Sequence, residues 1–329
     1  SRAVPASPEV RALAPTDPPA APQVPPFAGA EAMNTEYYLG SADEEQAMFA
    51  RFAEQISALQ DKQTSRRKQE LGRGFHAKAH GCVHGWFRPF PDRDPRTRFG
   101  VFADGQGPWP VWARFSNGVG WRQSDKELDA RGMAVKMMGV PGPKLVEEEH
   151  FTQDFLMTNA PTPVGRNAIE FMKFAHENEK GLIAGLLFAA SHPRSAGPAL
   201  SRTQPIPSMV AEQYWSGSAY HLGAHQAVKF TAKPCSTTRG RQGRGDGADW
   251  LAADLRDAAR EGFCYTLYVQ FQVDPDRTPI ENAGREWREE DAPLVPVGQF
   301  DFPGQDIAGE HHAQFCERLS FNPWHAVED

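Results

Sequence analysis

The sequence has few cysteines and no long apolar run, and each shortage excludes a class of protein. Its 329 residues include 4 cysteines, none in a Cys-x-x-Cys pair, which argues against a zinc cluster and against a dense disulfide framework. The longest apolar run, Gly181 to Pro193, is shorter than the ~20 residues that a bilayer requires, so we expect no membrane span. The net charge of −7 gives no electrostatic reason to expect a nucleic acid partner.

The beginning of the sequence is rich in proline and alanine. Residues 1–30 cannot build a core of their own, so we interpret them as an extended arm or linker ahead of a single domain over residues 31–329. The chain begins at Ser1 without a methionine, which suits a processed protein that is exported or periplasmic. An engineered start would look the same, so localisation stays open.

The remaining pattern predicts helices around a run of short strands. A Ser-x-x-Glu capping box at Ser41 and Glu44 opens a helix over residues 41–60, and further helices are predicted over 167–190 and 249–262. Short segments bounded by Gly, Pro or Asn are predicted as strands; they cover residues 99–105, 110–118, 130–139 and 264–274, with another near Val297. The run of short strands therefore predicts an antiparallel sheet or barrel with flanking helices.

Histidines recur every four residues in the segment Gly72 to Phe87. Its glycines disfavour a helix, and its period-two pattern predicts a strand. On a strand, at ~3.3 Å per residue, His76 and His80 would stand about 13 Å apart, whereas zinc–nitrogen bonds are about 2 Å long. This geometry excludes a three-histidine zinc site, and His80 and His84 are interpreted as ordinary surface or hydrogen-bonded residues.

Five motifs, in order along residues 35 to 329, resemble those of the haem catalases. One such motif alone would be weak, but the ordered set is specific. The motifs are "RGFHAKAHGCVHGWF", "WARFSNG" with "LDARGMAVK", "DFLMTNAP", "YWSGSAYHLGAHQAVKFTAKP", and "PLVPVGQFDF" followed by "ERLSFNPWH". The resemblance is greater to the compact, catalase-related peroxidase branch than to large catalases, because nothing here suggests the longer carboxy-terminal domains. It implies an α+β fold with an antiparallel β-barrel core and flanking helices.

The resemblance implies three catalytic residues at a ferric haem b that cleaves a peroxide. His76 matches the family histidine that takes the proton from one peroxide oxygen and returns it to the other. Asn159 matches the asparagine that orients the ligand by a hydrogen bond, and Ser116 matches the serine that fixes the histidine tautomer. The alternative interpretation of Asn159 and Ser116 is that each belongs to an ordinary turn.

The resemblance also implies cofactor contacts. Arg73 and Arg114 match the family arginines that bind the haem propionates, and Arg131 is interpreted as structural. Phe75 stands next to the predicted distal histidine, where catalases carry valine and allene oxide synthases carry threonine, so its ring would crowd the iron or redirect a bulkier hydroperoxide. The expected partners are a small-molecule peroxide, a reductant and further subunits in a homo- or hetero-oligomer.

One family feature is missing. Catalases bind iron through a tyrosine that follows the motif matched by "ERLSFNPWH", and the last tyrosines in this sequence are Tyr265 and Tyr268, on a predicted strand. We expect that the natural polypeptide continues past Asp329. The alternatives are that His325 or another residue substitutes, or that the protein is a non-catalytic binding or assembly module without haem. A further, weaker hypothesis is a metal site formed by a histidine pair and a cysteine on one helix, namely His311, His312 and Cys316.

Overall fold

The computed structural model describes residues 40–68, 72–146, 149–180, 187–188, 190–191, 202–223, 226–243 and 245–328. The predicted arm over residues 1–30 lies outside these residues, as does most of the predicted helix beyond residue 180. Within the described part of the chain, no helix has the length and apolarity to cross a bilayer.

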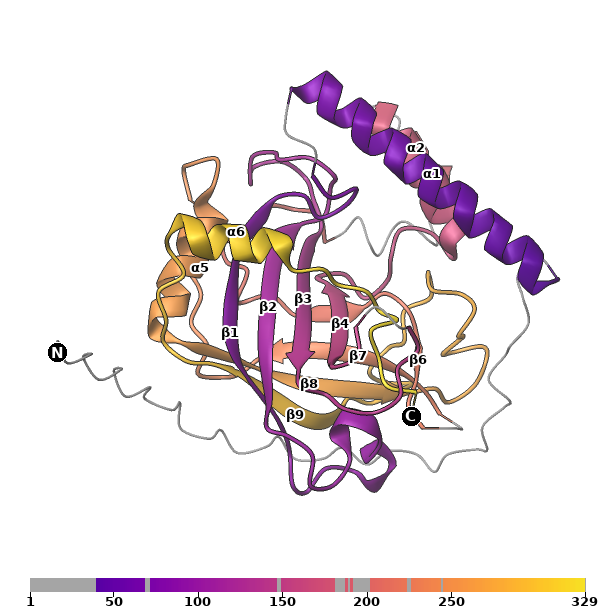
Figure 1. Cartoon of the computed structure of the whole chain (residues 1–329), viewed down its shortest axis with the longest axis vertical. Helices are drawn as coiled ribbons and strands as arrows, with labels where there is room; N and C mark the ends of the chain where they lie inside the picture. Colours follow the sequence, from indigo (N-terminus) through magenta and orange to yellow (C-terminus); the bar gives the residue numbers. More distant parts are fainter. Residues whose placement is uncertain are drawn as a thin grey trace, which may run out of the picture.

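The core of the molecule is a closed antiparallel β-barrel (Figure 1), as the sequence predicted. Neighbouring strands follow the order β5-β4-β3-β2-β1-β9-β8-β7-β6, and an additional pairing of β5 with β7 closes the sheet. Closure removes the open sheet edges that would otherwise expose unpaired backbone groups. The strands are β1 (Ala79–Pro89), β2 (Trp109–Asn117), β3 (Arg131–Met138), β4 (Thr152–Thr158), β5 (Tyr214–Ser216), β6 (Tyr220–His221), β7 (Ala227–Pro234), β8 (Phe263–Phe271) and β9 (Val295–Phe302).

Helices flank the barrel in two places. The helices α1 (Ala42–Arg67) and α2 (Ala168–Lys180) lie side by side over one end of it (Figure 1), joined by an ion pair of 2.9 Å between Lys62 and Glu179. The helices α5 (Trp250–Glu261) and α6 (Glu310–Arg318) contact β1.

The predicted helix starts and ends are confirmed at two positions. The Ser41 hydroxyl accepts a hydrogen bond from the Glu44 amide at 3.3 Å, which caps α1. Gly262 ends α5 with φ of 82°, a conformation that favours glycine.

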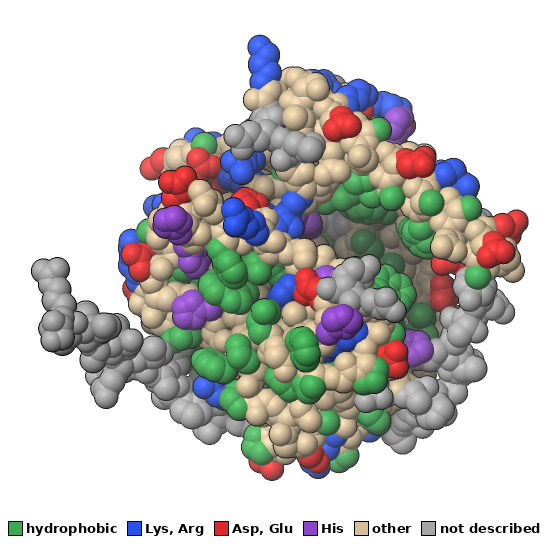
Figure 2. Space-filling model, in the orientation of Figure 1, with side chains coloured by type: hydrophobic (Ala, Val, Ile, Leu, Met, Phe, Trp, Pro, Cys, Tyr) green, Lys and Arg blue, Asp and Glu red, His purple; other side chains and the backbone are tan. Residues whose placement is uncertain are grey.

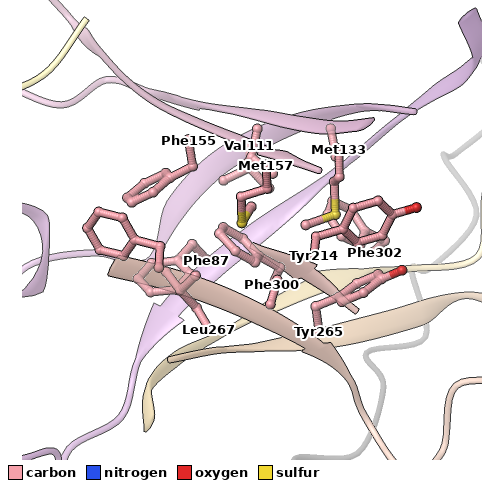
Figure 3. Packing of buried hydrophobic residues seen from close by; sticks show 14 of the residues in the cluster. Phe87, Val111, Met133, Phe155, Met157, Tyr214, Tyr265, Leu267, Phe300 and Phe302 are labelled. Atoms are coloured by element: carbon pink, nitrogen blue, oxygen red, sulfur yellow. The ribbon is translucent and has the colours of Figure 1, made fainter. Parts of the chain in front are cut away.

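Aromatic side chains fill the barrel between its two layers of strands (Figure 3). The rings of Phe87 on β1 and Phe300 on β9 lie 4.9 Å apart, and both residues are fully buried. Tyr214 and Tyr265 lie together at one end, where both hydroxyls donate to the carbonyl of Met209, at 2.8 and 3.1 Å. The core therefore buries its aromatic rings and satisfies the polar atoms of these two tyrosines.

Two predicted strands differ in the structure. Residues 99–105 form a short 3₁₀ turn at Gly100–Phe102 in place of a strand. The histidine-rich strand begins at Ala79, later than predicted, because the backbone of His76 takes a left-handed φ of 57° that a strand cannot contain. From Ala79 onward the predicted strand is confirmed, with a bulge before Gly81.

All four cysteines form disulfides. The spacing of the cysteines in the sequence did not predict these two cross-links. Cys82 bonds to Cys316, which ties β1 to α6, and Cys235 bonds to Cys264. The metal site predicted from His311, His312 and Cys316 is therefore wrong. Cys316 is committed to its disulfide, and His312 Nε2 lies 2.8 Å from the carbonyl oxygen of Cys82.

Close packing at Gly85 gives a test of the barrel register. A Cβ atom there would lie 2.0 Å from the backbone oxygen of Asp301 on β9. We expect Gly85→Ala to lower the free energy of unfolding by about 1–3 kcal/mol or more, because neighbouring strands would have to separate. Denaturant unfolding measures this change. Gly247→Ala is the control, because its nearest neighbour would be 3.9 Å away, and equal losses in both variants would contradict the register.

Candidate functional site

The predicted catalytic histidine lies where the chain enters β1. The His76 amide donates to the carbonyl of Gly118 at 2.9 Å, and its own carbonyl accepts from Arg114 Nη1 at 3.0 Å. A left-handed backbone is unfavourable for a residue with a side chain and persists where the surroundings hold it. These two hydrogen bonds provide that support.

The imidazole of His76 packs against β2 and β3, at Ser116 and Gly132. Its Nδ1 lies 3.0 Å from Ser116 Oγ, so the structure brings together two of the three predicted catalytic residues. Ser116 pairs with Gly132 across the β2–β3 ladder, and a Cβ at Gly132 would lie 2.5 Å from His76 Cε1. The glycine therefore provides the space that the imidazole occupies.

The surroundings of His76 disfavour its protonated form. Burial of the imidazole, followed by the positive charges of Arg114 and Arg73, lowers its pKa from 6.5 to about 4, and a hydrogen bond with the Asn117 backbone opposes the shift only in part. At neutral pH the side chain is therefore uncharged and able to accept a proton.

Asn159, the third predicted catalytic residue, is buried directly after β4. Its Oδ1 accepts from the Arg131 amide at 2.8 Å, while Nδ2 donates to the Arg202 carbonyl at 3.2 Å and to Glu212 Oε2 at 3.3 Å. Both amide hydrogens thus have protein partners in this structure. Donation to a ligand would require Nδ2 to leave one of them, and the role of Asn159 stays a prediction.

The two predicted propionate-binding arginines lie close to His76 and share an acidic neighbour. Arg114 is buried on β2, and its Nη2 lies 3.4 Å from a carboxylate oxygen of Glu317. Arg73 Nη2 donates to the backbone carbonyl of Glu317 at 2.8 Å. The Nε atoms of both arginines are buried without a hydrogen-bond partner. These unmet donors fit an additional anionic group, such as a haem carboxylate.

Phe75 extends the site towards the helix pair. Its ring lies 5.2 Å from that of Phe171 on α2. Figure 2 shows the molecule hollowed near α1 and α2, with hydrophobic side chains on part of the wall and basic side chains at one edge. An aromatic ring on the loop before β1 is consistent with the predicted crowding of a ligand beside His76.

The described tyrosines do not offer the anionic oxygen that would bind haem iron. Tyr214 and Tyr265 are fully buried in the core, and burial raises the pKa of each well above 10. Burial also raises the pKa of Tyr220 to about 12 and raises the pKa of Tyr268, which is half-buried on β8. The residues around His76 thus fit a haem, whereas the environments of these tyrosines do not favour the iron-binding role that a tyrosine has in catalases.

His325, considered above as a substitute ligand, is held elsewhere. It is buried, with Nδ1 2.8 Å from Asp154 Oδ2 and 3.4 Å from Lys136 Nζ. Lys136 lies four residues, or about 13 Å, along β3 from Gly132, against which His76 packs. His325 therefore belongs to a buried polar cluster that fixes the carboxy-terminal segment to β3 and β4.

Sequence reasoning missed a polar network beneath the site. Asn117 Oδ1 accepts from Arg131 Nη1 at 2.8 Å and lies 2.8 Å from His80 Nε2. These contacts agree with the structural interpretation of Arg131 and with that of His80 as a hydrogen-bonded residue. Glu317 was also missed, because a glutamate beside an arginine in "ERLSFNP" gives no signal of its distant partners.

Comparison with known proteins finds similarity to catalases. The family model for catalase matches residues 44–182. The structure resembles a bacterial catalase (TM-score 0.60, 22% identity, 83% of this chain covered), a fungal catalase (0.61, 20%, 92%) and catalase A from Saccharomyces cerevisiae (0.62, 19%, 92%). No curated protein sequence matches the chain. The chain thus matches the catalase family model over residues 44–182 and shares the fold of these catalases.

The chain is shorter than these relatives. It spans 55%, 61% and 63% of the length of the three catalase structures, in the same order. At 19–22% identity, the structural likeness concerns the fold and leaves the chemistry to be tested on this chain.

The depressed pKa of His76 predicts how the site responds to acid. The unfolded chain binds a proton near pH 6.5, whereas folded His76 does so only near pH 4, so this residue lowers stability as the pH falls between those values. We expect the His76 imidazole to titrate near pH 4 by NMR, and His76→Gln to lose less stability than the native chain between pH 6.5 and 4. A His76 titration midpoint near 6.5 would contradict the described packing.

Proposed function

We propose that the chain is a catalase-like haem protein that decomposes hydrogen peroxide or an organic hydroperoxide, and thus an oxidoreductase of the catalase or peroxidase type. The observation that carries the proposal is the bonded pair of His76 and Ser116, 3.0 Å apart, with an imidazole that stays uncharged at neutral pH. The match of residues 44–182 to the catalase family model and the charges of Arg73 and Arg114 beside His76 support it.

In this proposal, haem would supply the iron at which the peroxide O–O bond is cleaved. Ser116 Oγ holds His76 Nδ1, which leaves Nε2 as the nitrogen that takes a proton from one peroxide oxygen and returns it to the other. Because the pKa of His76 is low, the imidazole holds this proton only transiently. Gly132 and Ser116 fix the ring orientation, so the proton moves at a defined position.

Arg73 and Arg114 would hold the haem carboxylates. Their charges are close to His76 and partly desolvated, which strengthens their interaction with an anion. Phe75 and its contact with Phe171 support a substrate that approaches past aromatic rings, as an organic hydroperoxide would.

We propose further that the protein works in an oxidising compartment, as an exported or periplasmic protein. The two disulfides support this, because such bonds persist mainly outside reducing compartments.

A second candidate is a non-catalytic binding or assembly module that keeps the barrel without haem. The observation in its favour is that Tyr214 and Tyr265 are committed to the core. A protein that takes up no added hemin would support this candidate.

Removal of the His76 imidazole tests the proposed enzyme. We expect the native protein to take up hemin with a Soret band, and His76→Gln to keep the band while peroxide turnover falls by about 10²–10⁴-fold. Stopped-flow absorbance and oxygen release measure the two effects. His84→Gln is the matched control, because His84 is an exposed histidine on β1, eight residues further along the chain. Equal activity of His76→Gln and the native protein would reject the role of His76.

A further inference from the structure

Glu317, in the last turn of α6, carries a carboxylate that is shared by an arginine cluster. We use this term for Arg73, Arg114 and Arg122, whose nearest nitrogens lie 3.9, 3.4 and 3.7 Å from its oxygens. Charge-assisted hydrogen bonds are shorter, at about 2.7–2.9 Å. The carboxylate therefore neutralises part of the cluster without forming a tight, bidentate pair with any of its members.

The backbone at Glu317 is fixed, whereas its side chain has room to move. The disulfide of the preceding residue, Cys316, ties α6 to β1, and Arg73 Nη2 donates to the Glu317 carbonyl at 2.8 Å. The Glu317 side chain remains 39% exposed. The carboxylate can therefore leave the cluster by a change of rotamer while α6 stays in place.

The cluster is only partly satisfied by Glu317. The buried Nε atoms of Arg73 and Arg114 have no hydrogen-bond partner. A cavity of about 770 Å³ adjoins the cluster, and its lining includes Gln63, Trp121 and Arg318 as well as Arg73, Arg122 and Glu317. Glu317 is the acidic residue that faces this cavity in the part of the chain that the structure describes. Among the described residues that line the cavity, arginines therefore outnumber acidic side chains.

We propose that Glu317 is an internal counter-ion that occupies the arginine cluster until an anionic group of a ligand replaces it. Exchange would replace loose contacts of 3.4–3.9 Å with tighter hydrogen bonds, including bonds from the unmet Nε donors. The identity of the natural anion, a carboxylate of haem, rests on the proposed function. The competition between Glu317 and anions for the arginine cluster is independent of the proposed function.

The glutamine variant Glu317→Gln keeps the shape of the side chain and removes its charge. We expect it to bind inorganic pyrophosphate, and metal-free protoporphyrin IX with its two carboxylates, about threefold to tenfold more tightly than the native protein at low salt. The gain should shrink as salt is added. Calorimetry measures pyrophosphate binding, and quenching of porphyrin fluorescence measures the second ligand.

Glu310→Gln is the matched control, because Glu310 lies on the same helix and its side chain contacts Gln314. It should bind both probes as the native protein does. The double variant Arg73→Gln with Glu317→Gln should lose the gain. An unchanged or weaker pyrophosphate affinity in Glu317→Gln, or a gain that survives in the double variant, would overturn the proposal.

These probes separate this inference from the proposed function. A pyrophosphate gain in a protein that takes up no hemin would reject haem chemistry while supporting Glu317 as the counter-ion. Hemin uptake and peroxide turnover that do not differ between Glu317→Gln and Glu310→Gln, with no pyrophosphate gain, would reject the counter-ion and leave the enzyme supported.

Discussion

The candidate site depends on the left-handed backbone of His76. This conformation is unfavourable for a residue with a side chain, and it ends the extended path of the chain just before β1. Hydrogen bonds to Gly118 and from Arg114 stabilise it, and the turn that results directs the imidazole to Ser116 and Gly132. A continuous strand would have placed His76 in the ladder, with its side chain fixed by strand alternation.

The barrel gives this turn a rigid support. Ser116 on β2 is paired with Gly132 on β3. The register of these two strands therefore places both the hydroxyl that contacts the His76 imidazole and the glycine that leaves space for it. Strand pairing is resistant to small shifts, because a slip of one residue would turn every side chain to the opposite face. The aromatic core beneath the strands fixes that register by packing.

The carboxy-terminal part of the described chain completes the site from a distance in sequence. Arg114 bonds to the His76 carbonyl and also contacts Glu317, which lies 203 residues further along the chain. The disulfide between Cys82 and Cys316 holds α6 beside β1 and so keeps Glu317 near Arg114. The charge around His76 is therefore set jointly by β2, the loop before β1 and α6.

The sequence by itself determined the antiparallel strands and flanking helices, the capping of α1, the end of α5 and the resemblance to catalases, because these depend on local periodicity, turn residues and short motifs. It also identified His76 and Ser116 as a candidate pair. Only the tertiary structure decided that the backbone of His76 is left-handed and that both amide hydrogens of Asn159 bond to protein groups. It also decided that the cysteines are cross-linked and that Glu317 faces the arginines. The physical reason is that each of these features is formed by groups from separate segments. The local sequence does not determine which distant groups come into contact.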